Sequence, residues 1–170
     1  MLTSCDLLPE NFNWKDYSIK NNLDKILQIE DLCSLEKINK LKNFDNTINP
    51  KNKVPFPPEL DDLARLHFIS VNRKATTILE FGVGKSSQIF GDSLKINKLK
   101  WLEFSEKKLR RESLYQCHSV DNNSNWIEEC RKNTPIEFIK EKLLTFHEAK
   151  LITSEFLGRV CTYFDPIPNI

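Results

Sequence analysis

The most constraining feature of this chain is a pair of glycines that follows a short apolar segment. Residues 76–81 (TTILEF) are β-branched or apolar apart from Glu80, and Gly82 interrupts them. Such a run is typical of a strand buried on both faces, as in a parallel sheet covered by helices. Gly84 follows after one residue, and residues 88–94 predict a helix. The order strand, glycine turn, helix indicates the first unit of a doubly wound α/β fold.

The chain on either side of this turn predicts further helices and a second strand. Apolar residues at helical spacing predict a helix or helix pair over 20–42 and another helix over 58–71. An alternating segment predicts a second parallel strand over 115–120. For residues 95–114 two interpretations stay open, because a further helix and a short strand over 101–104 both fit the pattern.

Two short helices are expected after the second strand. Ser124 is a suitable N-cap for a helix over 125–132. Residues 134–137 (TPIE) have the spacing of a capping box, with proline at the first helical position, before a short helix that reaches about residue 143.

The C-terminal part of the chain predicts a β-hairpin. Residues 145–153 and 159–164 alternate between apolar and polar side chains and flank a loop over 154–158. We therefore predict a partial doubly wound (Rossmann-like) parallel sheet with N-terminal helices and a terminal β-hairpin. Residues 1–54 are interpreted as an N-terminal helical extension, and residues 55–170 as the incomplete Rossmann-like domain.

Composition excludes several classes of protein. The 170 residues carry 25 Lys and Arg against 24 Asp and Glu, and this balance lacks the basic footprint of a nucleic-acid binder. No apolar run reaches the length of a membrane span, and the N-terminus does not resemble a secretory signal. We expect a cytoplasmic protein. The five cysteines include no CxxC pair, so neither a zinc site nor a disulfide framework is predicted.

Two nucleotide-binding interpretations of the glycine turn can be weighed by spacing. Residues 84–86 spell GKS, but a phosphate loop requires a glycine at position 79, which is Leu79 in the predicted strand. A dinucleotide fingerprint requires a third glycine at position 87, which is Ser87, although Glu103 has about the spacing of a ribose-binding acid. A nucleotide- or NAD-binding α/β enzyme therefore stays open as an alternative.

A third interpretation also uses the acid before the turn. Residues 80–86 (EFGVGKS) have the form acid-x-Gly-x-Gly-x-Ser, which resembles motif I of the class I S-adenosylmethionine-dependent methyltransferases. In that family the glycines shape the floor under the methionine part of the cofactor, and the acid helps to hold its amino group. An acid at the end of the second strand binds the ribose hydroxyls. Asp121 matches that place, and Glu103 is its rival. The resemblance covers residues 57–135.

The resemblance implies S-adenosyl-L-methionine as the cofactor and names no catalytic base, no metal ligand and no methyl acceptor. The interval from Gly84 to Asp121 is longer than usual in the family, the hairpin is not a general family feature, and the later strands are not found. We therefore expect a truncated domain, with a non-catalytic remnant or interaction module of the same fold as a further alternative. The implied cofactor-binding residues are Glu80, Phe81, Gly82, Gly84, Ser86, Asp121 and Asn122.

The three histidines are far apart in the sequence. His67 falls in a predicted helix, and His118 and His147 fall in predicted strands. No spacing among them is typical of a metal site or of a nucleophile with its base. We therefore expect each to be a structural side chain.

Overall fold

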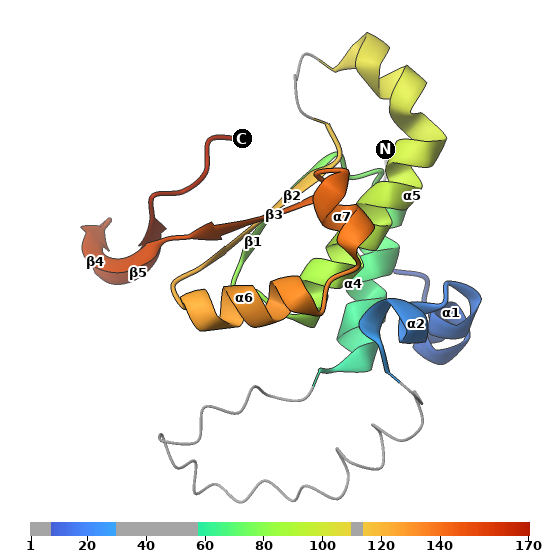
Figure 1. Cartoon of the computed structure of the whole chain (residues 1–170), viewed down its shortest axis with the longest axis horizontal. Helices are drawn as coiled ribbons and strands as arrows, with labels where there is room; N and C mark the ends of the chain where they lie inside the picture. The colour runs from blue at the N-terminus through green and yellow to red at the C-terminus, as the bar shows by residue number, and fades with distance from the viewer. Residues whose placement is uncertain (1–7, 30–57, 110–113) are drawn as a thin grey trace, which may run out of the picture.

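In a computed structural model of the chain, the structure describes residues 8–29, 58–109 and 114–170 (Figure 1). These residues form an α/β fold with N-terminal helices, a three-stranded parallel sheet and a C-terminal antiparallel hairpin. The predicted fold class is confirmed. Within these ranges no helix combines the length and the apolar character needed to cross a membrane.

The parallel sheet has the order β1-β2-β3. Its strands are β1 (Thr77–Phe81), β2 (Gln116–Asp121) and β3 (Leu144–Glu148). The register places Asp121, the last residue of β2, opposite Glu148, the last residue of β3. Because all three strands are parallel, their carboxyl ends meet at one edge of the sheet. This edge is where ligands bind in open α/β sheets.

Helix α5 (Lys85–Lys108) makes the crossing from β1 to β2 as one continuous helix. The alternative of a short strand over 101–104 is therefore wrong. Trp101 and Leu102 pack against the core as helical neighbours, and the Lys74 Nζ lies 3.9 Å from the centre of the Trp101 ring. These contacts hold the second half of the helix, which the sequence left undecided.

Helix α6 (Ser124–Lys132) follows β2 directly. Its N-cap is Asn123, whose side-chain oxygen accepts the N–H groups of Asn125 at 3.1 Å and Trp126 at 3.2 Å. The prediction that Ser124 caps this helix is wrong, because the amide one residue earlier already satisfies those donors.

Helix α7 (Ile136–Lys140) is shorter than predicted and begins without a capping box. Pro135 is the N-cap and makes no side-chain hydrogen bond. The Thr134 hydroxyl instead donates to the carbonyl oxygen of Cys130 at 2.7 Å, so it binds the end of α6. The predicted capping box at 134–137 is wrong for this reason.

The segment predicted as one strand over 145–153 is two strands in different sheets. The chain leaves the parallel sheet at Ala149, whose N–H donates to the carbonyl oxygen of Asp121 at 3.0 Å. Strand β4 (Lys150–Phe156) then pairs antiparallel with β5 (Arg159–Asp165). The hairpin is confirmed, but the single strand leading into it is wrong, because alternation continues unbroken while the pairing partner changes.

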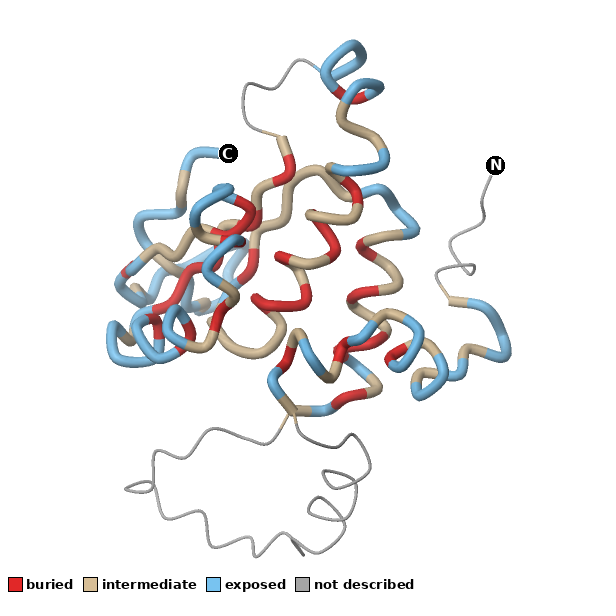
Figure 2. The backbone as a smooth tube through the Cα atoms, turned by 45° about the vertical axis from the view of Figure 1, so that its right-hand side comes forward, coloured by how far each residue is buried: buried red, intermediate tan, exposed pale blue. Residues whose placement is uncertain are grey.

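Helices α5, α6 and α7 contact the sheet and pack on one of its faces, and the buried positions along the chain are red in Figure 2. Phe146 shows this, because it joins the core from β3 while Arg131 of α6 lies 5.7 Å from the centre of its ring. The buried members of this core cluster are Leu94, Tyr115, Cys117, Phe138, Leu143 and Leu144.

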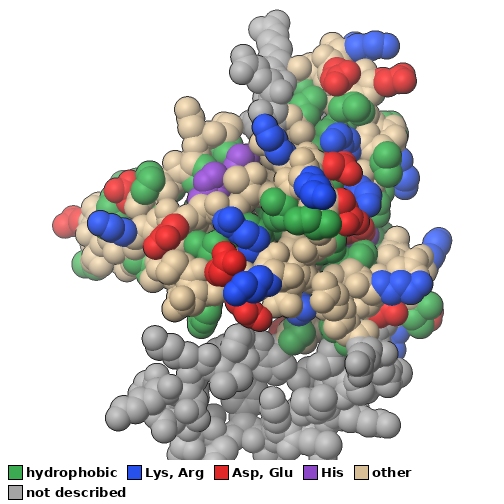
Figure 3. All heavy atoms as spheres, in the orientation of Figure 1, with side chains coloured by type: hydrophobic (Ala, Val, Ile, Leu, Met, Phe, Trp, Pro, Cys, Tyr) green, Lys and Arg blue, Asp and Glu red, His purple; other side chains and the backbone are tan. Residues whose placement is uncertain are grey.

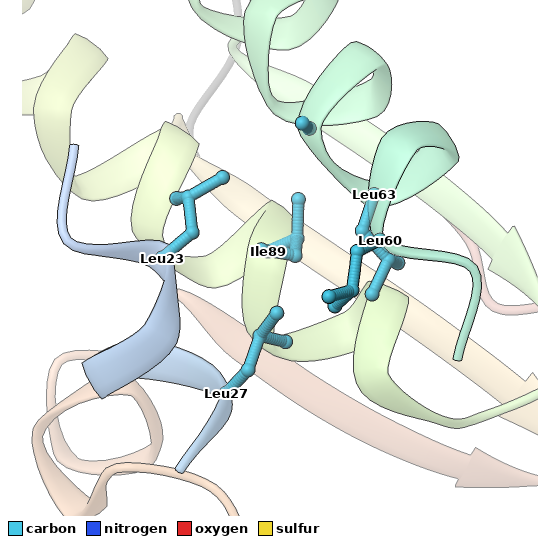
Figure 4. Packing of buried hydrophobic residues seen from close by; sticks show 6 residues of the cluster. Leu23, Leu27, Leu60, Leu63 and Ile89 are labelled. Atoms are coloured by element: carbon cyan, nitrogen blue, oxygen red, sulfur yellow. The ribbon is translucent and has the colours of Figure 1, made fainter. Parts of the chain in front are cut away.

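The N-terminal helices pack against the outer side of this layer. Helices α2 (Leu23–Leu27) and α4 (Leu60–Asn72) form a second cluster with α5 (Figure 4), and helix α1 (Trp14–Lys20) packs against it. Only α2 lies in the described part of the helix predicted over 20–42; residues 30–42 and the predicted boundary at residue 54 lie outside the described residues. The buried members of the second cluster are Leu23, Leu27, Leu60, Leu63, Ala64 and Ile89.

A buried histidine also joins the N-terminal helices to the rest of the fold. His67 in α4 is fully buried, and its Nδ1 lies 2.8 Å from the Tyr17 hydroxyl of α1. Its Nε2 lies 2.9 Å from Oδ2 of Asp92 in α5. Both ring nitrogens therefore have a partner, as the structural role predicted for this residue requires.

Candidate functional site

The chain leaves β1 through a turn at residues 82–84 that leads directly into α5. Gly82 has a φ of 91°, in the left-handed region, and its N–H donates to the carbonyl oxygen of Val120 at 2.7 Å. Gly84 has a φ of 174°, which is extended backbone. A Cβ added at either glycine would meet no heavy atom within 4 Å. The backbone therefore requires glycine at 82, whereas neither the backbone nor packing requires it at 84.

Asp121 ends β2 beside this turn. Its Oδ2 accepts the N–H of Val83 at 3.0 Å, and its Oδ1 accepts the N–H of Asn123 at 2.8 Å. A carboxylate has about four acceptor positions, two on each oxygen. Each oxygen of this buried side chain therefore keeps one acceptor position for a further donor. The structure brings the acid predicted to bind ribose into contact with the glycine turn.

Glu80 lies one residue before the end of β1, and its carboxylate is buried under the turn. Its Oε1 accepts the hydroxyl of Ser86 at 2.5 Å. Its Oε2 accepts the hydroxyls of Ser87 at 2.6 Å and Ser119 at 2.5 Å. Burial raises the pKa of Glu80, although the three hydroxyl donors favour the charged form and offset part of that rise. Glu80 thus ties the turn and α5 to β2.

The remaining predicted residues lie at the same edge with different surroundings. Phe81 is 55% exposed and stacks on Phe164 of β5, with ring centroids 5.5 Å apart and an angle of 10° between the planes. Asn122 is exposed between the end of β2 and the cap of α6. The Ser86 hydroxyl donates to Oε1 of Glu80.

Glu103, the rival candidate for the ribose acid, lies far from this edge. It is exposed on α5. At a rise of about 1.5 Å per residue, it stands about 27 Å along the helix axis from Lys85. The geometry therefore leaves Asp121 as the acid beside the turn.

The lysine that follows the turn, Lys85, is directed toward the N-terminal helices. Lys85 Nζ donates to the carbonyl oxygen of Leu27, at the end of α2, at 2.7 Å. Partial burial lowers the pKa of Lys85. In a phosphate loop the lysine reaches the phosphates. The Lys85 side chain instead attaches the N-terminal helices to the start of α5.

Two residues that matter for this edge were missed from the sequence. Glu148 ends β3 opposite Asp121 and is exposed, but the predicted strand over 145–153 ran through it. Ser119 supplies one of the three donors to Glu80, and only the register of β1 and β2 reveals that contact. All three parallel strands thus carry a carboxylate at or next to their carboxyl ends.

This arrangement favours a neutral or cationic ligand that carries hydroxyl groups. Asp121 and Glu148 present carboxylate oxygens at the edge, and the turn presents backbone without side chains at two of its positions. Carboxylates accept hydrogen bonds from hydroxyl and ammonium groups and repel phosphates. Comparison with known proteins adds no assignment: no family model, no curated protein and no solved structure matches the chain.

Proposed function

We propose that the carboxyl edge of the sheet binds S-adenosylmethionine and that the chain is methyltransferase-like. The observation that carries the proposal is the 3.0 Å hydrogen bond from the Val83 N–H to Oδ2 of Asp121. It joins the glycine turn after the first strand to the acid after the second strand. These are the two elements that the resemblance assigns to the methionine and ribose parts of the cofactor.

The residues at the edge have separate roles in this proposal. The open acceptor positions of Asp121 receive the two ribose hydroxyls, because one carboxylate can accept two donors at once. Gly84 lets the cofactor approach the backbone. Glu80 acts chiefly through the turn that it holds, and one acceptor position on its Oε1 remains for a donor of the cofactor. Phe81 and Asn122 border the site on either side.

The charge of the edge separates this proposal from the nucleotide-binding alternative. A sulfonium cofactor is positively charged at the reacting atom, and the carboxylates of Asp121 and Glu148 attract it. The pyrophosphate of NAD or ATP would meet the same carboxylates, while Lys85 is engaged with Leu27. Methyl transfer itself is an in-line displacement in which the protein mainly positions the two reactants.

A ligand titration with matched variants tests the proposal. The melting temperature of the full chain is followed while S-adenosylhomocysteine, NAD or ATP is added, since a ligand that binds the folded state raises it. Asp121→Asn should weaken S-adenosylhomocysteine binding by about 10- to 100-fold, the worth of hydrogen bonds to a charged acceptor. Glu103→Gln removes a carboxylate from the far part of α5 and should bind like the parent chain.

The outcomes separate the alternatives. A larger shift with NAD or ATP than with S-adenosylhomocysteine selects a nucleotide-binding enzyme. No shift with any of the three at millimolar ligand, in a chain that melts cooperatively, selects a module of the same fold without a cofactor. Equal loss of binding in Asp121→Asn and Glu103→Gln contradicts the site, because only one of these acids lies at the edge.

A further inference from the structure

Two histidines from adjacent strands meet on the sheet face opposite α5, α6 and α7. Cys117 of β2 and Leu144 of β3 point into the core under those helices. Side chains alternate between the faces of a strand, so His118 and His147 point to the other face. The register pairs His118 with Thr145, two residues before His147. The two imidazoles are therefore diagonal neighbours, although they are far apart in the sequence.

These two rings contact each other, a pairing that their separation in the sequence did not predict. Nδ1 of His118 lies 3.1 Å from Nε2 of His147. The ring centroids are 5.3 Å apart with an interplanar angle of 29°. Both rings are partly exposed, and Figure 3 shows a patch of histidine side chains at the surface. An ion from solution can therefore reach the pair.

The separation of the two nitrogens suits a shared metal ion. Zinc binds histidine nitrogen at about 2.0–2.1 Å, so two nitrogens at the observed distance would subtend about 98° at the ion. That angle lies between the right angle of square-planar coordination and the wider tetrahedral angle. The distance between the two nitrogens is thus compatible with one ion bound by both rings.

Metal binding also fits the hydrogen bond that joins the two rings. A neutral imidazole carries one N–H and offers a lone pair on its other nitrogen. On binding, the hydrogen shared between the two nitrogens moves to the far nitrogen of its own ring. Each imidazole keeps one N–H, and no net proton is released.

We propose that His118 and His147 bind a divalent transition ion, of which Zn²⁺ is the probe, with water in the remaining coordination positions. Imidazole is a preferred ligand of zinc, copper and nickel. Within residues 8–29, 58–109 and 114–170, no group of three or more His, Cys, Asp or Glu is placed to hold an ion. The site therefore has two protein ligands and open positions, unlike the closed four-ligand sites that stabilise small domains.

A titration of the full chain with ZnCl₂, followed through the imidazole ¹⁵N resonances, tests the proposal. The chain has three histidines, and His67 is an internal reference because it is fully buried with both nitrogens hydrogen-bonded. The resonances of His118 and His147 should move together and saturate at one ion per chain, while those of His67 stay in place. Movement of only one of the two, or of neither, overturns the proposal.

Matched variants locate the ion. His118→Gln and His147→Gln should each weaken Zn²⁺ binding at least about tenfold, because one of two ligands is lost. Thr145→Val changes the residue directly opposite His118 without removing a nitrogen and should bind Zn²⁺ like the parent chain. Parent-like affinity in the double variant places the ion at another donor, such as a cysteine, and overturns the proposal. Should a variant fail to fold, the titration of the parent chain decides.

Discussion

Replacing Gly84 by alanine should leave the fold intact while it weakens cofactor binding. The φ of 174° at this residue is open to any side chain, and the added Cβ would meet no heavy atom within 4 Å. Replacing glycine at a compatible position reduces the freedom of the unfolded chain and stabilises proteins by about 0.4–1 kcal/mol. Gly84 is also the N-cap of α5, where alanine is less favourable than glycine, so the two effects oppose each other. The unfolding free energy of Gly84→Ala should therefore stay within about 1 kcal/mol of that of the parent.

The cost appears only in binding, because the new methyl group would project from the floor of the proposed site. Crowding by an extra methyl group costs about 1–3 kcal/mol where neighbours cannot move. The affinity for S-adenosylhomocysteine should fall by about 5- to 150-fold. Isothermal titration calorimetry measures this loss, and urea denaturation followed by circular dichroism measures the stability of the same samples.

Gly82→Ala supplies the contrast, since its φ of 91° strains any residue with a side chain. Strain of this kind costs about 1–3 kcal/mol, so this variant should lose stability. If Gly84→Ala binds S-adenosylhomocysteine as tightly as the parent, the cofactor does not approach this part of the turn. If Gly84→Ala is as unstable as Gly82→Ala, the backbone argument for position 84 is wrong.

Further changes at Glu80, Gly91 and Tyr17 act on buried groups. Glu80→Ala leaves two fully buried serine hydroxyls, those of Ser87 and Ser119, without their acceptor, so urea denaturation should show an unfolding free energy lower by about 2–6 kcal/mol. A decrease of less than about 1 kcal/mol would contradict the conclusion that Glu80 stabilises the turn. The pKa of Glu80 is raised in the folded state above its ordinary value of 4.5, so the stabilising contribution of this carboxyl is present below pH 4.5 and is lost as the pH rises through the raised pKa. The parent should therefore lose stability relative to Glu80→Gln over that pH range. The same pH dependence in both proteins would refute this. Gly91→Ala would place a Cβ 2.6 Å from Cδ2 of Phe138, so overpacking should lower the unfolding free energy by about 1–3 kcal/mol in the same assay. Tyr17→Phe leaves Nδ1 of the buried His67 without its hydroxyl partner, at a cost of about 1–3 kcal/mol, and faster amide hydrogen exchange in α1 should report it.

The strand, the glycine turn and the hairpin were predictable because their signals are local. A run of β-branched and apolar residues that stops at Gly82 can be recognised without knowledge of the rest of the chain. Helix α5 was harder, because its second half exposes Leu99 by 80% and Phe104 by 60%, so its apolar residues do not mark one buried face. The break at Ala149 leaves no signal in the sequence either, since the alternation of a strand does not name the partner with which it pairs.

The candidate site was predictable in part for the same reason. Acids that end parallel strands share an edge, so the prediction of a second parallel strand that ends before Asp121 was enough to expect this acid near the glycine turn. The register of the strands, by contrast, is a property of the assembled sheet. It alone brings Ser119 to Glu80 and His118 to His147. Contacts between residues that are far apart in the sequence but lie on neighbouring strands were therefore what the sequence did not reveal.

Glu80 connects the stability of the fold to the proposed site. A buried carboxylate is costly unless hydrogen bonds compensate it, and here Ser86, Ser87 and Ser119 supply them. Those same bonds hold the first turn of α5 and the middle of β2 around the glycines, so the acceptor oxygens of Asp121 face a backbone that is fixed before a ligand arrives. Preorganisation of this kind lowers the cost of binding. A change in the serines should therefore weaken the proposed binding of S-adenosylmethionine through the turn, even though their hydroxyls are directed at Glu80.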